Sequence, residues 1–520
     1  MIPLTLAEVA AATGGRLVDG ADPAATVTGA VRVDSRAVGA GDLFVALPGA
    51  RADGHDFAPG AVAAGATAVL ATRATGVPAV LVDDAQAALG LLARAVVDRL
   101  RSGPSGLTVV AVTGSSGKTS TKDLLRVLLS RLGATVAPEG SFNNEIGHPL
   151  TALRCDEGTR YLVAEMGARM PGNIAYLCGI TPPDVSVALN VGSSHLGVFG
   201  SREVIAATKG EIVEALAADG VAVLNADDPY VSAMAARTAA RVVRFGESPS
   251  ADVRADDVRL DAAARPRFRL VTPAGEADVA LPLHGEHHVS NALAAAAVAL
   301  ELGMSPQTVA DGLGTATAAS RWRMEVHERP DGVTVVNDAY NANPDSVKAA
   351  LKALAAMGRG DGGPGAARRT WAVLGEMLEL GEESVREHDL LGRLAVRLDI
   401  SRLVAVGEGG RPYHQGASHE GSWGEESAWV PDPDAALAVL RSGLRPGDVV
   451  LVKASRGVGL DRLAAALLDD AVTQGDPASV TAPATPGAPL PTVAAVTGED
   501  VGSPDREAVG APGREEESTP

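Results

Sequence analysis

Short apolar runs alternate with glycine-containing turns over the first hundred residues. Residues 42–47 (DLFVAL) and 68–71 predict strands, and residues 58–64 predict a helix. The sequence RSGPSG at 101–106 has the composition of a linker. We therefore expect a first α/β domain over residues 1–103.

Apolar runs of strand length alternate with amphipathic stretches after this linker. Residues 107–112 (LTVVAV) predict a buried strand, and residues 118–132 predict a helix that ends at Gly133. Further strands are expected at 161–164, 185–191 and 221–224. The alanine-rich stretch at 291–300 predicts a buried helix. Strands that alternate with helices indicate a parallel sheet with crossover helices, so we expect a second domain over residues 104–317.

The same alternation returns in a third unit, which we expect to span residues 318–470 as a second doubly wound domain. Its strands are predicted at 333–336, 370–374, 403–406 and 449–452. Residues 471–520 contain eight prolines and end near a run of three glutamates. That segment cannot bury enough apolar surface to offset the entropy of ordering it, so we expect a disordered tail.

The charge and the cysteine content of the chain limit which binding partners and which cellular compartment are expected. A formal net charge of −19 gives the chain no general attraction to nucleic acid or to anionic lipid. Two cysteines are too few for a disulfide framework and fit a reducing compartment. Neither a secretory leader nor a membrane span is evident in the sequence. We therefore expect a cytoplasmic protein without a nucleic-acid partner.

The most specific local motif lies at residues 113–120 (TGSSGKTS), between a predicted strand and a predicted helix. This setting is typical of a phosphate-binding loop, because glycines let the backbone turn tightly and point N–H groups at phosphate oxygens. Lys118 can reach the terminal phosphates, and the Thr119 hydroxyl can hold Mg²⁺. Val112 stands where this motif usually begins with glycine. The motif predicts nucleotide binding by Gly114, Ser115, Ser116, Gly117, Lys118, Thr119 and Ser120.

Three further residues could take part in the chemistry. Glu165 and His195 each follow a predicted strand, and ligands of such sheets bind at the carboxyl ends of strands. A helix-capping acid and a loop histidine are equally good interpretations of these two residues from local sequence. Lys209 could be a surface lysine of a helix. However, only six of the 45 basic residues are lysines, which hints that a retained lysine serves as an amine.

A series of segments between residues 30 and 465 resembles the Mur ligase family. In chain order they are DSRAVGAGDLFVALPGARADGHDF, TGSSGKTSTKD, SFNNEIGHPLTAL, AEMGARMPGNI, NVGSSHLGVFGS, ATKGEI, NADDP, NALAAAAVA, RMEV, NDAYNANPDS, LGEMLELG and LVKASRG. The resemblance implies an N-terminal α/β domain that binds a UDP-sugar, a central P-loop ATPase-type parallel sheet domain and a C-terminal Rossmann-like domain.

The family resemblance also implies site roles. ATP and Mg²⁺ are the expected cofactors, with Lys118, Glu165, His195 and Lys209 as the catalytic group. The expected Mg²⁺ ligands are Thr119, Glu165, His195 and Lys209, the last as a carbamate. Nucleotide contacts would further include Asn291, Arg323 and Asp338. Contacts to the two substrates are expected from Asp34, Ser35, Arg36, Asp53, Gly54, His55, Asn143, Asn144, Asn341, Asn343, Lys453, Ser455 and Arg456.

Within the family, the motifs resemble members that join D-alanyl-D-alanine to a UDP-linked muramoyl tripeptide through an acyl phosphate in peptidoglycan synthesis. The resemblance therefore implies two small-molecule substrates, and we expect a monomer. A sister ligase for a diamino acid would be expected to carry Asn-Pro-Arg, whereas residues 343–346 are NPDS. Trp322, His288 and Ala454 depart from the family pattern at positions usually held by Gly, Asn and Gly.

Three other interpretations remain. A related ligase with another amino-acid substrate would use a single amino acid and not the dipeptide. A non-catalytic binding protein would keep the nucleotide fold without the chemistry, although the joint presence of the catalytic lysines, acid and imidazole argues against it. A plain NTPase would hydrolyse ATP without either wall precursor.

Overall fold

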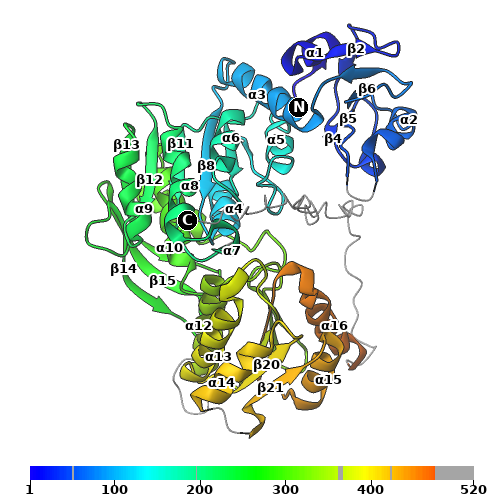
Figure 1. Cartoon of the computed structure of the whole chain (residues 1–520). Helices are drawn as coiled ribbons and strands as arrows, with labels where there is room; N and C mark the ends of the chain where they lie inside the picture. Colours follow the sequence, from blue (N-terminus) through cyan, green and yellow to red (C-terminus); the bar gives the residue numbers. More distant parts are fainter. Residues whose placement is uncertain (50–51, 195, 361–366, 422–423, 475–520) are drawn as a thin grey trace, which may run out of the picture. The chain divides into compact units, whose positions relative to one another are not determined.

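The computed structural model describes residues 1–49, 52–194, 196–360, 367–421 and 424–474 (Figure 1). Among these, Thr5–Ala85 form one compact unit, and Met1–Leu4 together with the chain from Gln86 onward form another. The predicted domain boundaries at 103, 317 and 470 stay predictions. In the described part of the chain, no helix has the length and apolar character needed to cross a membrane.

The unit of residues 5–85 is built on a five-stranded sheet with the order β2-β7-β6-β5-β4. All neighbours in it pair in parallel except β2 and β7. Phe44, Val69 and Ala71 form its core together with Ala58 and Ala61 of the helix between β5 and β6. The elements of this part are β1 (Leu4–Thr5), α1 (Leu6–Thr13), β2 (Arg16–Val18), β3 (Thr26–Val27), β4 (Val31–Arg32), η1 (Ser35–Ala37), β5 (Leu43–Val45), η2 (Gly54–Phe57), α2 (Ala58–Ala63), β6 (Ala68–Ala71) and β7 (Ala79–Leu81).

A nine-stranded sheet forms the centre of the second unit, with the order β16-β15-β14-β13-β12-β11-β8-β10-β9. Its strands from β9 to β14 pair in parallel, as expected, and β14, β15 and β16 continue it as an antiparallel meander that the sequence did not predict. The strands are β8 (Thr108–Thr113), β9 (Thr135–Val136), β10 (Tyr161–Glu165), β11 (Val185–Ala188), β12 (Val221–Asn225), β13 (Arg241–Gly246), β14 (Val253–Leu260), β15 (Pro266–Thr272) and β16 (Gly275–Ala280).

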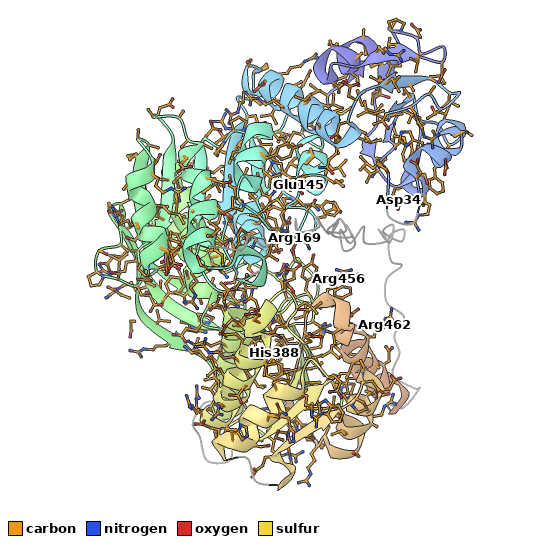
Figure 2. The ribbon with its side chains drawn as sticks, in the orientation of Figure 1. Asp34, Glu145, Arg169, His388, Arg456 and Arg462 are labelled. Atoms are coloured by element: carbon orange, nitrogen blue, oxygen red, sulfur yellow. The ribbon has the colours of Figure 1, made fainter. Side chains whose placement is uncertain are left out.

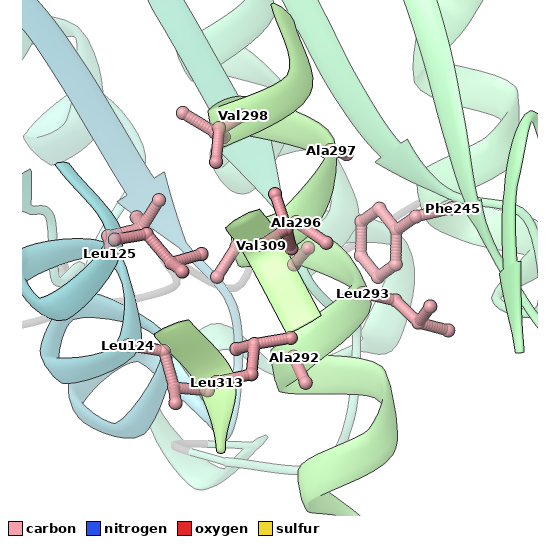
Figure 3. Close-up of a cluster of buried hydrophobic side chains, with 14 of the residues drawn as sticks. Leu124, Leu125, Phe245, Ala292, Leu293, Ala296, Ala297, Val298, Val309 and Leu313 are labelled. Carbon is pink, nitrogen blue, oxygen red and sulfur yellow. The ribbon is translucent and has the colours of Figure 1, made fainter. Parts of the chain in front are cut away.

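Helices cover this sheet. Figure 3 shows how α4, α10 and α11 bring Leu125, Ala296 and Val309 together over the sheet, beside Phe245 of β13. Alanines let α10 lie close to its neighbours, and its 14 residues are too few to cross a membrane. The helices of this part are α3 (Ala85–Arg101), α4 (Lys118–Leu129), α5 (Gly147–Ala152), α6 (Asn173–Ile180), α7 (Leu196–Phe199), α8 (Arg202–Glu214), α9 (Pro229–Ala233), η3 (Met234–Arg237), α10 (His288–Glu301) and α11 (Pro306–Leu313).

A six-stranded sheet follows, with the order β17-β18-β22-β19-β20-β21, and it is parallel except at the edge strand β17. Alternate strand residues pack against different helices: Ala372 and Leu374 belong to the core under α12–α14, whereas Trp371 and Val373 belong to the core under α15 and α16. The sheet is therefore doubly wound, as predicted. Its elements are β17 (Glu325–Glu328), β18 (Thr334–Asn337), α12 (Pro344–Arg359), β19 (Thr370–Leu374), η4 (Gly381–Glu383), α13 (Ser384–Arg397), β20 (Arg402–Val406), α14 (Arg411–Glu420), η5 (Gly424–Glu426), β21 (Ser427–Val430), α15 (Pro433–Gly443), β22 (Val449–Lys453), η6 (Arg456–Val458) and α16 (Leu460–Gln474).

Several element ends differ from those predicted. α4 ends at Leu129 and not at residue 132, because the last residues form turns. β11 ends at Ala188, which leaves residues 189–191 in the following loop. α16 extends through Gln474, past the predicted start of the tail at 471. The rest of the predicted disordered tail lies outside the described residues.

Candidate functional site

The predicted phosphate loop connects the end of β8 to the first turn of α4 (Figure 1). Gly117 caps the helix with φ 81°, in the left-handed region that glycine tolerates best. A Cβ atom at this position would lie 2.4 Å from Oδ1 of Asn291 on α10. Both the backbone conformation and the close approach of α10 therefore require glycine here.

Asn190, which the sequence analysis did not single out, holds the loop in shape. Its Oδ1 accepts a hydrogen bond from the backbone N–H of Ser116 at 2.9 Å, and its Nδ2 donates to the Ser116 carbonyl at 3.2 Å. The Asn190 carbonyl accepts from the backbone N–H of Ser115 at 3.1 Å. The residue begins the NVGSSH motif after β11, and β11 pairs with β8, so neighbouring strands place it beside the loop.

Lys118 lies at the start of α4 and folds back over the loop, where its Nζ donates to the Gly114 carbonyl at 2.6 Å. Burial lowers the pKa of this amine, Glu165 acts in the opposite direction, and Arg323 adds to the lowering. The ammonium group is therefore placed among the predicted nucleotide residues and next to a carboxylate. A cation at a helix start with free N–H groups suits the terminal phosphates of a nucleotide.

Thr119 and Glu165 converge beside this lysine. The Thr119 hydroxyl donates to Glu165 Oε1 at 3.3 Å, and Nδ2 of Asn143 donates to the same oxygen at 2.7 Å. Parallel pairing of β10 with β8 sets Glu165 opposite Val112, immediately before the loop. Glu165 is 1% exposed, and its second oxygen, Oε2, has no hydrogen-bond partner. A buried carboxylate oxygen without a partner, next to a threonine hydroxyl, fits an oxygen-ligated divalent cation.

Lys209 is buried on α8, 6% exposed. Burial lowers the pKa of its amine well below the usual value, and the positive charge of Lys118 adds to this. A lysine in such a place is poised to be a neutral amine, which is a nucleophile. His195, the other predicted metal ligand, lies outside the described residues. Within the described ranges, no group of three His, Cys, Asp or Glu residues is arranged to hold a metal ion.

Arg323 occupies a backbone segment with an unusual conformation. Its neighbours Trp322 and Met324 have φ of 59° and 50°, in the left-handed region that bulky residues rarely adopt. The guanidinium donates to Ser141 Oγ at 2.8 Å and lies 4.2 Å from the Tyr340 ring centroid. Ser141 in turn lies 3.1 Å from Oγ1 of Thr119, so it bridges Arg323 and the phosphate loop.

Asp338 and the buried Lys453 form a partly buried ion pair at the carboxyl ends of β18 and β22. Lys453 Nζ donates to Asp338 Oδ2 at 2.7 Å and to the Asn341 carbonyl at 2.8 Å. Ser455 Oγ accepts from the Leu378 backbone N–H at 2.9 Å. These predicted residues therefore meet at one edge of the sheet, where doubly wound folds bind ligands.

Arg456, labelled in Figure 2, begins η6 and is exposed. It lies over two aromatic rings. Its guanidinium carbon is 5.1 Å from the Trp322 ring centroid and 5.4 Å from that of Tyr340. Trp322 departs from the family glycine, and this stacking gives the larger side chain a partner.

Other predicted residues also cap or brace local structure. Asn343 caps α12, and its Nδ2 donates to Ser194 Oγ at 2.5 Å. Asn144 Oδ1 accepts from the backbone N–H of Gly147 at 2.8 Å. His288 is buried, and its pKa lies well below the usual value because of burial and of the neighbouring histidines.

A pocket with a volume of about 230 Å³ lies beside α4. Ser120 and Arg323, two predicted nucleotide residues, both line it. His288, Asp123 and Ser320 contribute further polar groups to its wall. The pocket therefore joins the phosphate-loop helix to the segment that carries Arg323.

In the N-terminal unit, the predicted UDP-sugar residues lie in the turns that follow β4 and β5, at the same edge of a parallel sheet. Asp34 accepts two side-chain hydrogen bonds from Arg36, at 2.8 and 2.7 Å, and these bonds lower the pKa of the Asp34 carboxyl. Ser35 begins η1 between them.

The second turn is built around Asp53 and His55. Asp53 lies 2.5 Å from His55 Nδ1, and Arg73 donates to its other oxygen at 3.0 Å. A Cβ at Gly54 would lie 2.6 Å from the Leu47 carbonyl, so only glycine fits this position. The turn presents backbone and charged groups in a fixed arrangement.

The chain matches three domains of one family in order: residues 28–97 match the Mur ligase family catalytic domain, residues 112–299 the Mur ligase middle domain, and residues 322–456 the Mur ligase glutamate ligase domain. The UDP-N-acetylmuramoyl-tripeptide–D-alanyl-D-alanine ligase of Mycobacterium leprae is 54% identical, over 90% of this chain and 99% of that protein. The enzyme of the same name from Escherichia coli is 35% identical, over 90% and 99% of the two chains.

Solved structures agree with this similarity. A crystal structure of MurF from Acinetobacter baumannii has a TM-score of 0.80 at 32% identity, covering 90% of this chain and 99% of that one. The MurF ligase of Thermotoga maritima, solved in complex with ADP, has a TM-score of 0.74 at 32% identity, covering 86% and 99%. The similarity therefore extends over nearly the whole of each relative.

Proposed function

The chain belongs to the Mur ligase family, and we propose that it joins D-alanyl-D-alanine to UDP-N-acetylmuramoyl-tripeptide at the expense of ATP. The products are UDP-N-acetylmuramoyl-pentapeptide, ADP and phosphate, in peptidoglycan precursor synthesis. The observation that carries this proposal is the convergence of Lys118, Thr119 and Glu165 at the phosphate loop, in a chain that matches such ligases along its length.

The reaction must first activate a carboxylate, which is a poor electrophile because its charge is delocalised. An oxygen of the tripeptide's terminal carboxylate attacks the γ-phosphorus of ATP, the bond from that phosphorus to the bridging oxygen breaks, and ADP leaves. The acyl phosphate then has a good leaving group. Lys118 lies where it can offset negative charge on the phosphoryl group during this transfer.

The amine of the dipeptide attacks the acyl carbon in the second step. The carbon–oxygen bond to phosphate breaks, and the new peptide nitrogen loses a proton. Water would destroy the acyl phosphate, so exclusion of solvent by the C-terminal domain is an expected part of the cycle. Asn341, Asn343, Lys453, Ser455 and Arg456 are proposed to face the dipeptide or the phosphates.

The residues present fit Mg²⁺. The unpartnered Oε2 of Glu165 and the hydroxyl of Thr119 are oxygen ligands of the kind Mg²⁺ prefers. Lys209, after its neutral amine adds to CO₂ and loses a proton, would supply a carbamate oxygen, and His195 is proposed as the remaining ligand. The ion, when bound, would supply positive charge near the transferring phosphoryl group.

The proposed surroundings are those of a cytoplasmic enzyme that acts as a monomer on two small molecules. Cys155 and Cys178 are both free and buried, which suits a reducing compartment. The nucleotide is proposed to contact Asn291, Arg323 and Asp338, and the UDP-sugar the turns at residues 34–36 and 53–55.

Replacing Lys118 with alanine tests the proposal. The variant should lose about 100-fold or more of its ligation rate, since it removes a charge aimed at the transferring group. Pentapeptide formation from both substrates, followed by mass spectrometry, measures this. A Lys118→Ala protein that is folded and ligates at the full rate would refute the assigned role of the loop.

A further inference from the structure

One segment of the family pattern, LGEMLELG at residues 374–381, has no role in the reaction described above. It leaves the sheet at the end of β19 and crosses to the end of β22. The Gly375 backbone N–H donates to the Lys453 carbonyl at 3.0 Å, and the Ser455 N–H donates to the Glu376 carbonyl at 3.0 Å. This loop is therefore bonded to the strand end that carries two of the residues proposed to face the dipeptide.

The far end of the loop meets the central domain. The Gly197 backbone N–H donates to the Glu379 carbonyl at 3.3 Å, and Arg169 Nη2 lies 3.4 Å from Glu379 Oε1. Gly197 belongs to the NVGSSHLGVFGS segment that also carries His195. The loop thus forms a wall between the carboxyl edge of the C-terminal sheet and the proposed catalytic segment.

The loop cannot hold this shape by itself. Glu379 has φ 63°, a left-handed conformation that costs a non-glycine residue free energy. Its packing is also tight, because a Cβ on Gly381 would lie 2.9 Å from the Gly197 Cα. Strained backbone of this kind persists only where neighbouring groups fix it.

His388, labelled in Figure 2, lies on α13 and supplies such a contact from a buried position. Its Nε2 accepts a hydrogen bond from the Met377 backbone N–H at 2.8 Å, and its Nδ1 lies 2.6 Å from the Ser384 carbonyl. An N–H donor on one side and a carbonyl on the other fix the neutral tautomer with the proton on Nδ1. The side chain is 0% exposed, and the Tyr413 ring packs edge-on at 4.7 Å.

We propose that His388 is a positioning residue for the incoming dipeptide: through the Met377 backbone it holds the Gly375–Gly381 wall against Lys453 and Ser455. This inference rests on the proposed function, since it names the part of that site which receives the second substrate. Leu378 donates to Ser455 Oγ at 2.9 Å, directly after the residue that His388 holds, so a displaced loop would also release Ser455.

Two variants of His388 that carry amide side chains distinguish the loss of the hydrogen bond to Met377 from the mere loss of side-chain volume. In His388→Gln the amide oxygen can reach the place of Nε2 and accept from Met377, whereas in His388→Asn it reaches only the place of Nδ1. Arg386→Ala is the matched control, because this exposed residue lies on the same helix and pairs with Glu383. The measurements are the KM for D-alanyl-D-alanine, the KM for ATP and kcat.

The expected result is a dipeptide KM raised about tenfold in His388→Asn, as for one buried N–H left without its acceptor, with an unchanged KM for ATP. His388→Gln should stay within about threefold of the wild type, and Arg386→Ala should match it. Equal loss in both amide variants, a parallel rise in the KM for ATP, or no change in either would overturn the proposal.

A second measurement, which uses the wild-type protein and needs no enzyme assay, tests the proposal even if a variant folds poorly. In wild-type protein with ¹⁵N-labelled histidine, His388 should show an unprotonated Nε2 and a protonated Nδ1, and amide exchange at Gly375, Met377 and Leu378, whose N–H groups donate within the protein, should be slow. A protonated Nε2 or fast exchange there would overturn the positioning role. Wild-type protein that forms no pentapeptide would instead refute the proposed function, and the two failures are thereby distinguished.

Discussion

Lys209 shows how one buried side chain can carry a chemical prediction. Its amine is buried and lies near the charge of Lys118, and both effects lower its pKa. A neutral amine can add to CO₂, whereas the guanidinium of arginine stays protonated and cannot. The proposed metal site therefore requires lysine at this position and not merely a positive charge.

Lys209→Arg should accordingly lose about 100-fold or more of the ligation rate, through the loss of one proposed metal ligand. Lys352→Arg is the matched control, because Lys352 is exposed on α12 and should tolerate the change. Initial rates of pentapeptide formation with excess Mg²⁺ decide the matter. Comparable rates in the two variants would contradict the carbamate role.

His148 gives a prediction about stability. It is buried at the start of α5, its Nε2 lies 2.8 Å from the Thr181 hydroxyl, and burial lowers its pKa to about 4. The unfolded chain, with a histidine pKa near 6.5, binds the proton more readily than the folded chain. The free energy of unfolding therefore falls as pH drops from about 6.5 towards 4, by roughly 3 kcal/mol from this group.

His148→Gln should remove that part of the pH dependence. Urea unfolding at pH 7.5, 6.5, 5.5 and 5.0 would show a shallower decline for the variant, although its stability at pH 7.5 is expected to be lower. His287, whose pKa burial also lowers to about 4, contributes to both proteins and cancels in the difference. Parallel curves for variant and wild type would argue against this assignment.

At the scale of elements, the pair α13 and α14 holds the proposed dipeptide wall in place. A Cβ on Gly392 of α13 would lie 2.0 Å from the Tyr413 carbonyl, and one on Gly416 of α14 would lie 2.1 Å from the Asp389 carbonyl. Only glycine at these two facing positions permits such a close helix contact. His388 and Tyr413 meet because of it.

Gly392→Ala should therefore push the helices apart and lower the free energy of unfolding by about 3 kcal/mol, the upper end of overpacking costs. Gly179→Ala is a suitable control, since a Cβ there, also on a helix, meets nothing within 4 Å. Denaturant unfolding of both variants measures the difference. A small effect at Gly392 would show that the helices can separate freely.

Local patterns predicted many of the parallel strands and the phosphate loop, because these are contiguous in sequence. β19, for example, was predicted with its observed ends, but the parallel strands β9, β13 and β21 were not predicted. The antiparallel strands β14–β16 were missed because the prediction relied on apolar runs, whereas successive residues of these strands alternate between more and less buried positions. Ser141 could not be predicted as a bridge, because its partner Arg323 lies 182 positions away and only the folded sheet brings them together.

At the scale of the whole molecule, the net charge of −19 works against binding anionic substrates. We propose that nucleotide and UDP-sugar are therefore held by local groups: helix starts, Lys118 and Arg323 in one unit, and the Arg36 and Arg73 turns in the other.

The most direct test of the proposed ligation is phosphate release from ATP by the purified protein with Mg²⁺, UDP-N-acetylmuramoyl-tripeptide and D-alanyl-D-alanine, omitting one component at a time. We expect that release requires both substrates and that a UDP-linked pentapeptide appears in equal amount. Release that does not depend on the dipeptide, or that occurs with a single amino acid in its place, would contradict this proposal.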